Sequence, residues 1–80
     1  MSIDRGRAWD LFGAPNEQQG SVNDPRSHVE HGVRWNEKWV YLSEDGSRPA
    51  RLLLWHRYDL VGAFEIGPEG AVGALPLPKE

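Results

Sequence analysis

Apolar and polar residues alternate through the middle of the chain, and this alternation predicts an antiparallel β-hairpin. Trp35, Trp39 and Tyr41 stand at alternate positions of the segment 33–42. A turn-forming segment that contains Asp-Gly follows at 43–47, and a second apolar run occupies 52–55. Asp-Gly between two such runs is a strong short-range signal for a hairpin, so the two runs are expected to pair.

Further short runs of the same kind predict the other strands of a small sheet. The expected strands cover about 29–35, with or without a break at Asn36-Glu37 before residue 42, then about 50–58, 60–66 and 71–75. Gly67-Pro68-Glu69-Gly70 is expected to form the turn before the last strand. Pro76 and Pro78 would end that strand at a sheet edge.

The register of the Asp-Gly hairpin stays open between two alternatives. The predicted pairs are Trp39 with Leu52 and Trp35 with His56 for a two-residue loop, or Trp39 with Arg51 and Trp35 with Trp55 for a three-residue loop with Gly46 in a bulge. The first alternative places Trp39 in a plain apolar core. The second allows an arginine to stack on an indole and two indoles to pair.

The N-terminal third differs in character from the rest of the chain. A short helix is expected over 3–12, with Ser2 or Asp4 as its N-cap and Gly13 at its end. Its buried side is expected to carry Ile3, Ala8, Leu11 and Phe12, with Trp9 at the edge. An isolated helix of this length forms only if it docks.

The polar segment 14–26 is expected to be a loop or a flexible linker, because it has very little to bury. The chain therefore divides into an N-terminal arm, residues 1–27, with the short helix and the polar linker, and a compact antiparallel β domain, residues 28–80. The fold class is mostly β (α+β), a small antiparallel sheet or partly open barrel of three to five strands with a short N-terminal helix or flexible arm.

Composition limits how such a small domain is stabilised. The 80 residues include no cysteine, so disulfides are excluded, but they include four tryptophans, two tyrosines and two phenylalanines. Large aromatic rings bury about 150–250 Å² each and make an aromatic core plausible. Association with a second copy is the next expected source of stability.

The charge balance argues against two classes of partner. A formal net charge of −3 gives no general attraction to phosphate backbones or to anionic membranes. The apolar runs are too short for a membrane span or for the hydrophobic core of a secretory leader. We therefore expect a cytoplasmic protein that does not contact a membrane.

Residue types that carry catalysis are sparse. His28, His31 and His56 could serve a small metal-binding or catalytic domain, but two histidines three apart on a strand point to opposite faces. There is no Gly-x-Ser-x-Gly nucleophile motif and no phosphate-binding glycine loop with its lysine. The sequence thus favours a protein that is not an enzyme, with no metal and no cofactor.

Binding of single-stranded nucleic acid is an alternative. Basic residues interleave with aromatic ones, as in small β domains that stack bases on aromatic rings. They are Arg34, Lys38, Arg48, Arg51 and Arg57 among Trp35, Trp39, Trp55 and Tyr58. Five acidic residues in the same region cancel this field, which disfavours the alternative.

A protein-binding role agrees best with the sequence. A small sheet has few ways to bury four tryptophans, and a ring left exposed beside arginine is typical of an interface. The expected partner-binding residues are Trp35, Trp39, Arg51, Trp55 and Arg57. The hypothesis is a non-catalytic interaction or accessory domain that contacts a protein or a second copy of itself. The competing interpretation is that all four rings are core.

Overall fold

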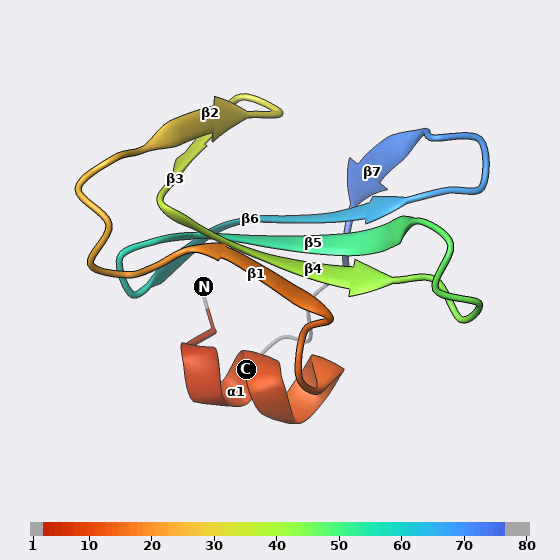
Figure 1. Ribbon diagram of the computed structural model, residues 1–80, viewed down its shortest axis with the longest axis horizontal. Coiled ribbons are helices and arrows are strands. Elements are labelled where there is room, and N and C mark those ends of the chain that lie inside the picture. The colour runs from red at the N-terminus through yellow and green to blue at the C-terminus, as the bar shows by residue number, and fades with distance from the viewer. Residues whose placement is uncertain (1–2, 77–80) are drawn as a thin grey trace.

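An open five-stranded antiparallel sheet forms the centre of the molecule, with a helix beneath it and a β-hairpin above it (Figure 1). The computed structural model describes residues 3–76. The elements in chain order are α1 (Arg5–Phe12), β1 (Glu17–Gly20), β2 (His28–Glu30), β3 (Val33–Trp35), β4 (Glu37–Leu42), β5 (Pro49–His56), β6 (Asp59–Ile66) and β7 (Val72–Ala74). The five strands lie in the order β1-β4-β5-β6-β7, and β2 pairs with β3 alone. The predicted mostly β class is confirmed, as a sheet that does not close into a barrel.

Local capping explains where α1 begins and ends. The Asp4 side chain accepts a hydrogen bond of 2.7 Å from the Arg7 N–H, and the Gly13 N–H donates to the Trp9 carbonyl at 2.8 Å. Gly13 has a φ of +78°, which glycine adopts readily at the end of a helix. Ala8 is buried as expected, but the expected burial of Leu11 is wrong, because its side chain stays 37% exposed.

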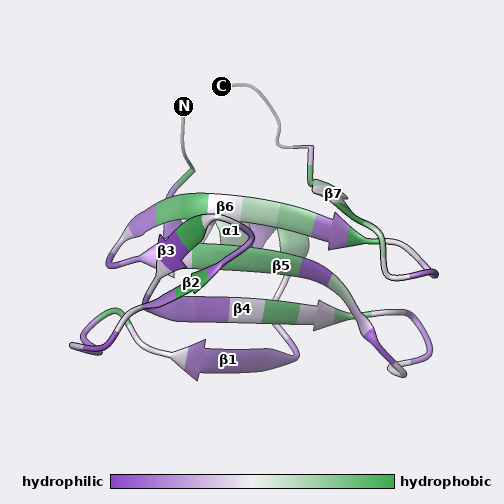
Figure 2. Cartoon of the chain, turned by 90° about the horizontal axis from the view of Figure 1, so that it is seen from above, coloured by the Kyte–Doolittle hydropathy of each residue, from purple (hydrophilic) through white to green (hydrophobic). Residues whose placement is uncertain are grey.

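Strand β1 lies in the segment that was expected to be a loop, and that expectation is wrong for Glu17–Gly20. The strand pairs with β4 and sets Gln18 opposite Trp39. Asn16 fixes its start, because its N–H donates to the Val40 carbonyl and its side chain accepts from the Leu42 N–H, each at 2.9 Å. All four residues of β1 are exposed, and Figure 2 shows the strand as hydrophilic. Main-chain pairing therefore holds this strand.

The predicted strand over 29–35 is in fact a hairpin of two short strands. His31 and Gly32 form its turn with φ values of +54° and +77°. Positive φ at both positions is the requirement of a two-residue type I′ turn. The hairpin β2–β3 folds over the upper face of the sheet, where β3 contacts β5 and β6 (Figure 1).

Both predicted registers of the Asp-Gly hairpin are wrong at Trp39, because a bulge between Tyr41 and Leu42 shifts the pairing of β4 and β5 by one residue. Trp39 pairs with Leu53, and the main chain closes the loop with a hydrogen bond of 2.8 Å from the Ser43 N–H to the Arg48 carbonyl. The Asp45 carboxylate accepts bonds from the Ser43 hydroxyl and from the Ser47 N–H and hydroxyl. These bonds lower the pKa of Asp45 to about 2. The same bonds stabilise the loop between β4 and β5.

The C-terminal half follows the prediction closely. Strand β5 ends two residues earlier than expected, at a turn where Arg57 has a φ of +59°. Strands β6 and β7 flank the predicted turn, in which the Gly70 N–H donates to the Gly67 carbonyl at 2.9 Å. Strand β7 forms one edge of the sheet, as predicted. Pro78 lies outside the described residues.

The main core lies between α1 and the lower face of the sheet. Trp39 and Trp55 pack there with ring centroids 4.9 Å apart. The other buried members of this cluster are Ile3, Ala8, Tyr41 and Leu53. The helix of the N-terminal arm and the strands of the β segment therefore share one core.

Candidate functional site

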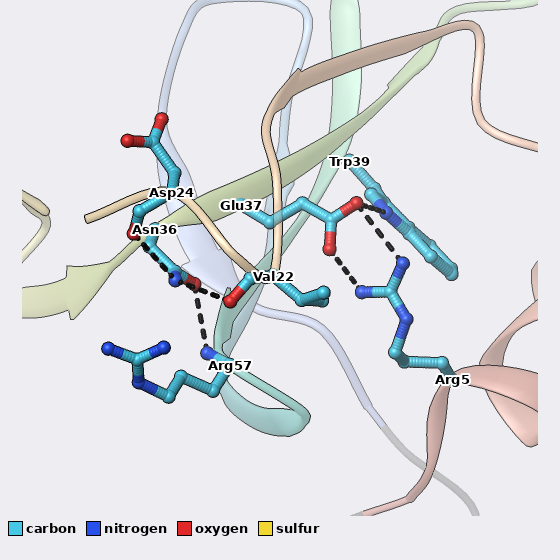
Figure 3. A network of polar contacts seen from close by, with 7 residues as sticks. All are labelled: Arg5, Val22, Asp24, Asn36, Glu37, Trp39 and Arg57. Atoms are coloured by element: carbon cyan, nitrogen blue, oxygen red, sulfur yellow. Dashed lines mark hydrogen bonds and ion pairs between the residues drawn. The ribbon is translucent and has the colours of Figure 1, made fainter. Parts of the chain in front are cut away.

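The buried carboxylate of Glu37 joins α1 to the sheet (Figure 3). Arg5 donates to both oxygens of Glu37, one of them at 3.2 Å, and the Trp39 indole N–H donates to the same carboxylate at 3.0 Å. The Arg5 guanidinium lies 4.9 Å from the Trp39 ring centroid and 5.4 Å from that of Trp55. The carboxylate and the guanidinium are thus held by partners within the chain. We interpret this cluster as a structural connection.

Asn36 is a second buried polar group with a structural role (Figure 3). Its side-chain amide donates to the Val22 and Asp24 carbonyls at 3.1 and 3.3 Å, and its side-chain oxygen accepts from the Arg57 N–H at 2.9 Å. One side chain thereby holds the segment after β1 and the turn after β5 at the point where β3 ends. The full use of this amide explains why a polar residue is tolerated there.

The five predicted partner-binding residues do not share an exposed surface. Trp39 and Trp55 are buried between α1 and the sheet, and the Arg51 guanidinium lies on the same side, 5.4 Å from the Tyr41 ring centroid. Trp35 is buried on the upper side, and Arg57 is exposed in a turn. The expected exposed aromatic face on the two strands is therefore absent from the described residues. The physical reason is that the arm docks its helix on these rings.

Trp9 is the indole that remains accessible. Its side chain is 46% exposed, and the ring meets Trp39 edge to face with centroids 5.8 Å apart. The sequence placed this residue at the edge of the helix, and that expectation is confirmed. The sequence indicated that a small sheet has few ways to bury four tryptophans. The chain in fact buries three of the four indoles itself, and the exposed one lies on the helix.

The histidines occupy separate places. His28 lies against Trp35 with centroids 4.8 Å apart, and His31 lies against Phe64 at 5.1 Å. His56 pairs with Asp59 across the β5–β6 ladder. Within residues 3–76, no group of three or more histidine, aspartate or glutamate side chains converges in a way that could hold a metal ion.

The aromatic platform required for nucleic-acid stacking is also missing from the two strands, because Trp35, Trp39 and Trp55 are buried. Tyr58 is exposed, but it stands alone in the turn after β5. Lys38 binds Glu30 with distances of 2.9 and 3.0 Å from its amine to the two carboxylate oxygens, so its charge is already compensated.

The upper face of the sheet carries the feature that sequence reasoning missed. A cavity of about 290 Å³ opens between the tip of the β2–β3 hairpin and the β6–β7 hairpin. We call it the upper trough. Its apolar lining includes Val40, Leu52, Ile66 and Val72, and its polar lining includes Glu30, His31 and Lys38. Alternation along a strand contains no signal for which part of a face of the sheet remains uncovered.

Strand β7 forms one wall of the upper trough and is itself incomplete in pairing. It pairs with β6 on one side and has no strand on the other side among the described residues. Val72, which lines the trough, is 43% exposed. An apolar cavity and an unpaired strand edge therefore adjoin each other.

The chain has no match among protein-family models, curated proteins or solved structures. Its function must therefore be argued from its own geometry. No helix in the described part of the chain has the length and apolar character needed to cross a membrane.

Proposed function

We propose that this protein is a non-catalytic protein-binding domain whose contact surface is the upper trough together with the free edge of β7. The observation that carries the proposal is an apolar trough with a buried floor of Val40 and Leu52 and an exposed wall at Val72, beside an unpaired strand. Extended segments bind to such strand edges through main-chain hydrogen bonds, and adjacent pockets select their side chains. The contact surface thus differs from the one predicted from the indoles.

The size of the trough supports a protein partner over a cofactor. Sites for small molecules usually measure about 300–1,000 Å³, and the volume of the trough, about 290 Å³, lies just below that range. A volume of this size suits one large apolar side chain of a partner, of the kind that dominates interface energies. The compensated Lys38–Glu30 pair at its border adds little net charge. The cytoplasm remains the proposed location, which suits a chain without cysteine.

Selection of peptides tests this proposal. Random linear peptides displayed on phage are selected on the immobilised 80-residue chain, and enriched peptides are expected to share one large apolar residue. Val72→Lys is expected to weaken their binding at least about tenfold, because it places a charge in the apolar wall. Val61→Lys is the matched control, since Val61 is 40% exposed and lies outside the trough lining.

Two results would contradict the proposal. One is that no peptide is enriched above a surface without protein. The other is that Val72→Lys and Val61→Lys weaken the selected peptides equally, which would place their binding outside the upper trough.

A further inference from the structure

We propose that β7 pairs in an antiparallel manner with β7 of a second copy of this chain, around a twofold axis at Gly73. The two open sheets then join into one continuous sheet. This inference rests on the proposed function and deepens it, because it names the partner for the edge of the contact surface. The partner is recognised through its main chain.

The hydrogen bonds of β7 establish which of its residues face outward. Before the strand begins, Ala71 accepts from the Gly67 N–H at 2.9 Å, and after it ends, Leu75 donates to the Ala63 carbonyl at 3.0 Å, so both bonds lie on the side of β6. Main-chain groups alternate in direction along a strand, so residues 71, 73 and 75 face β6. Val72 and Ala74 therefore direct their N–H and C=O groups away from the sheet.

This edge is complementary to itself. With the axis at Gly73, Val72 of one copy stands opposite Ala74 of the other, and the two residues exchange both of their main-chain bonds. The central pair is then Gly73 with Gly73, a pair without hydrogen bonds in which the Cα atoms approach to about 4.5 Å. Two hydrogen atoms replace the side chains at this closest approach. The space beside Gly73 is also open, since a Cβ there would meet no atom within 4 Å.

The charge distribution also favours a second copy of the chain as the partner at the edge of β7. Residues 70–76 contain no charged side chain, so two copies meet at this edge without local repulsion. The opposite edge strand, β1, carries Glu17, and charged side chains on edge strands are a common device against pairing. The charge of −3 on each copy is a general repulsion that added salt screens. Dimerisation should therefore strengthen as the salt concentration rises.

The strength of the association follows from its size. Strand β7 has three residues, so the paired edge is small compared with a standard interface of about 1,600 Å². We expect a dissociation constant on the order of 10⁻⁴ M, which is typical of weak contacts.

Sedimentation of the full chain tests the pairing. The wild-type chain is expected to dimerise over a dilution series that spans the expected dissociation constant. Ala74→Pro removes an outward N–H and is expected to weaken the dimer at least about tenfold, while the bonds to β6 from residues 73 and 75 remain. Gln18→Pro is the matched control, because it removes an N–H from the edge of β1 and should leave the dimer unchanged. Circular dichroism checks that both variants fold.

Amide hydrogen exchange on the wild-type chain gives a second readout that needs no variant. The N–H groups of Val72 and Ala74 are expected to exchange more slowly as the protein is concentrated, while that of Gln18 keeps its rate. A monomer at every concentration, or protection at β1 in place of β7, would overturn the inference. Either result leaves the peptide selection to decide on the trough, so the two proposals fail separately.

Discussion

Replacing Glu37 with alanine is expected to lower the free energy of unfolding by about 3 kcal/mol, the lower end of the usual effect of removing one partner of a buried ion pair, because the Arg5 side chain is 29% exposed. Arg5 would lose both of its bonds to the carboxylate, and the Trp39 indole N–H would lose its acceptor inside the core. The helix α1 would then keep its apolar contacts but lose its polar connection to β4. Small domains have about 5–15 kcal/mol of stability in total, so this loss is large.

Urea denaturation followed by circular dichroism measures the effect. Glu30→Ala is the matched control, because it also removes a glutamate that binds a cation, the Lys38 amine, but at a more exposed site. The Glu30 carboxylate is 34% exposed and that of Glu37 is 6% exposed, so water compensates more of the loss at Glu30, and this control should lose clearly less stability than Glu37→Ala. Equal losses for the two variants would contradict a special role for Glu37.

Replacing Gly20 with alanine is expected to cost about 3 kcal/mol or more, through two separate effects. Gly20 has a φ of +73°, where a side chain costs about 1–2 kcal/mol. A Cβ at this position would also lie 2.2 Å from the main-chain oxygen of Asn36. That oxygen accepts a hydrogen bond from the Ser21 N–H and belongs to a buried residue. The main chain at Asn36 therefore cannot easily move away from the added Cβ.

Gly46→Ala separates the two effects. Gly46 has nearly the same φ, +72°, but a Cβ there would meet nothing within 4 Å. This variant should therefore show the conformational cost alone, about 1–2 kcal/mol. The difference between the two variants, measured by urea denaturation, is the cost of the contact with Asn36. No difference would show that β1 does not approach Asn36 closely.

Local signals predicted the parts of the fold that local chemistry determines. Asp4 and Gly13 mark the ends of α1 because capping depends on a few neighbouring residues. The Gly67–Gly70 turn and the edge position of β7 followed from proline and glycine in the same way. The type I′ turn at Gly32 carries a comparable signal, a glycine between two short runs, but the neighbouring His31 made it less visible.

Other features depend on contacts between distant parts of the chain and could not be predicted. Strand β1 has no apolar pattern, and its position depends on the free edge of β4 and on Asn16. The register of β4 on β5 depends on a bulge between Tyr41 and Leu42, which shifts the pairing by one residue. The conformational preferences of single residues contain no information on the pairing of β1 or on the register of β4 on β5.

The candidate site shows the same limit. Alternation predicts which residues of a strand share a face of the sheet, but it does not indicate which face α1 covers. The indoles of Trp39 and Trp55 therefore became core, and the open half of the upper face, with Val72 at its wall, became the candidate surface. Aromatic residues in the sequence indicated an interface, whereas in the structure they hold the helix in place.

The central claim is that the chain covers its strand indoles with its own helix and hairpin, so that contact with partners falls to the upper trough and to β7. Quenching of tryptophan fluorescence by acrylamide tests this claim most directly. The wild-type chain is predicted to contain one accessible component of emission, and Trp9→Phe is predicted to remove it. Strong quenching that persists in Trp9→Phe would show that a strand indole is exposed and would contradict the account.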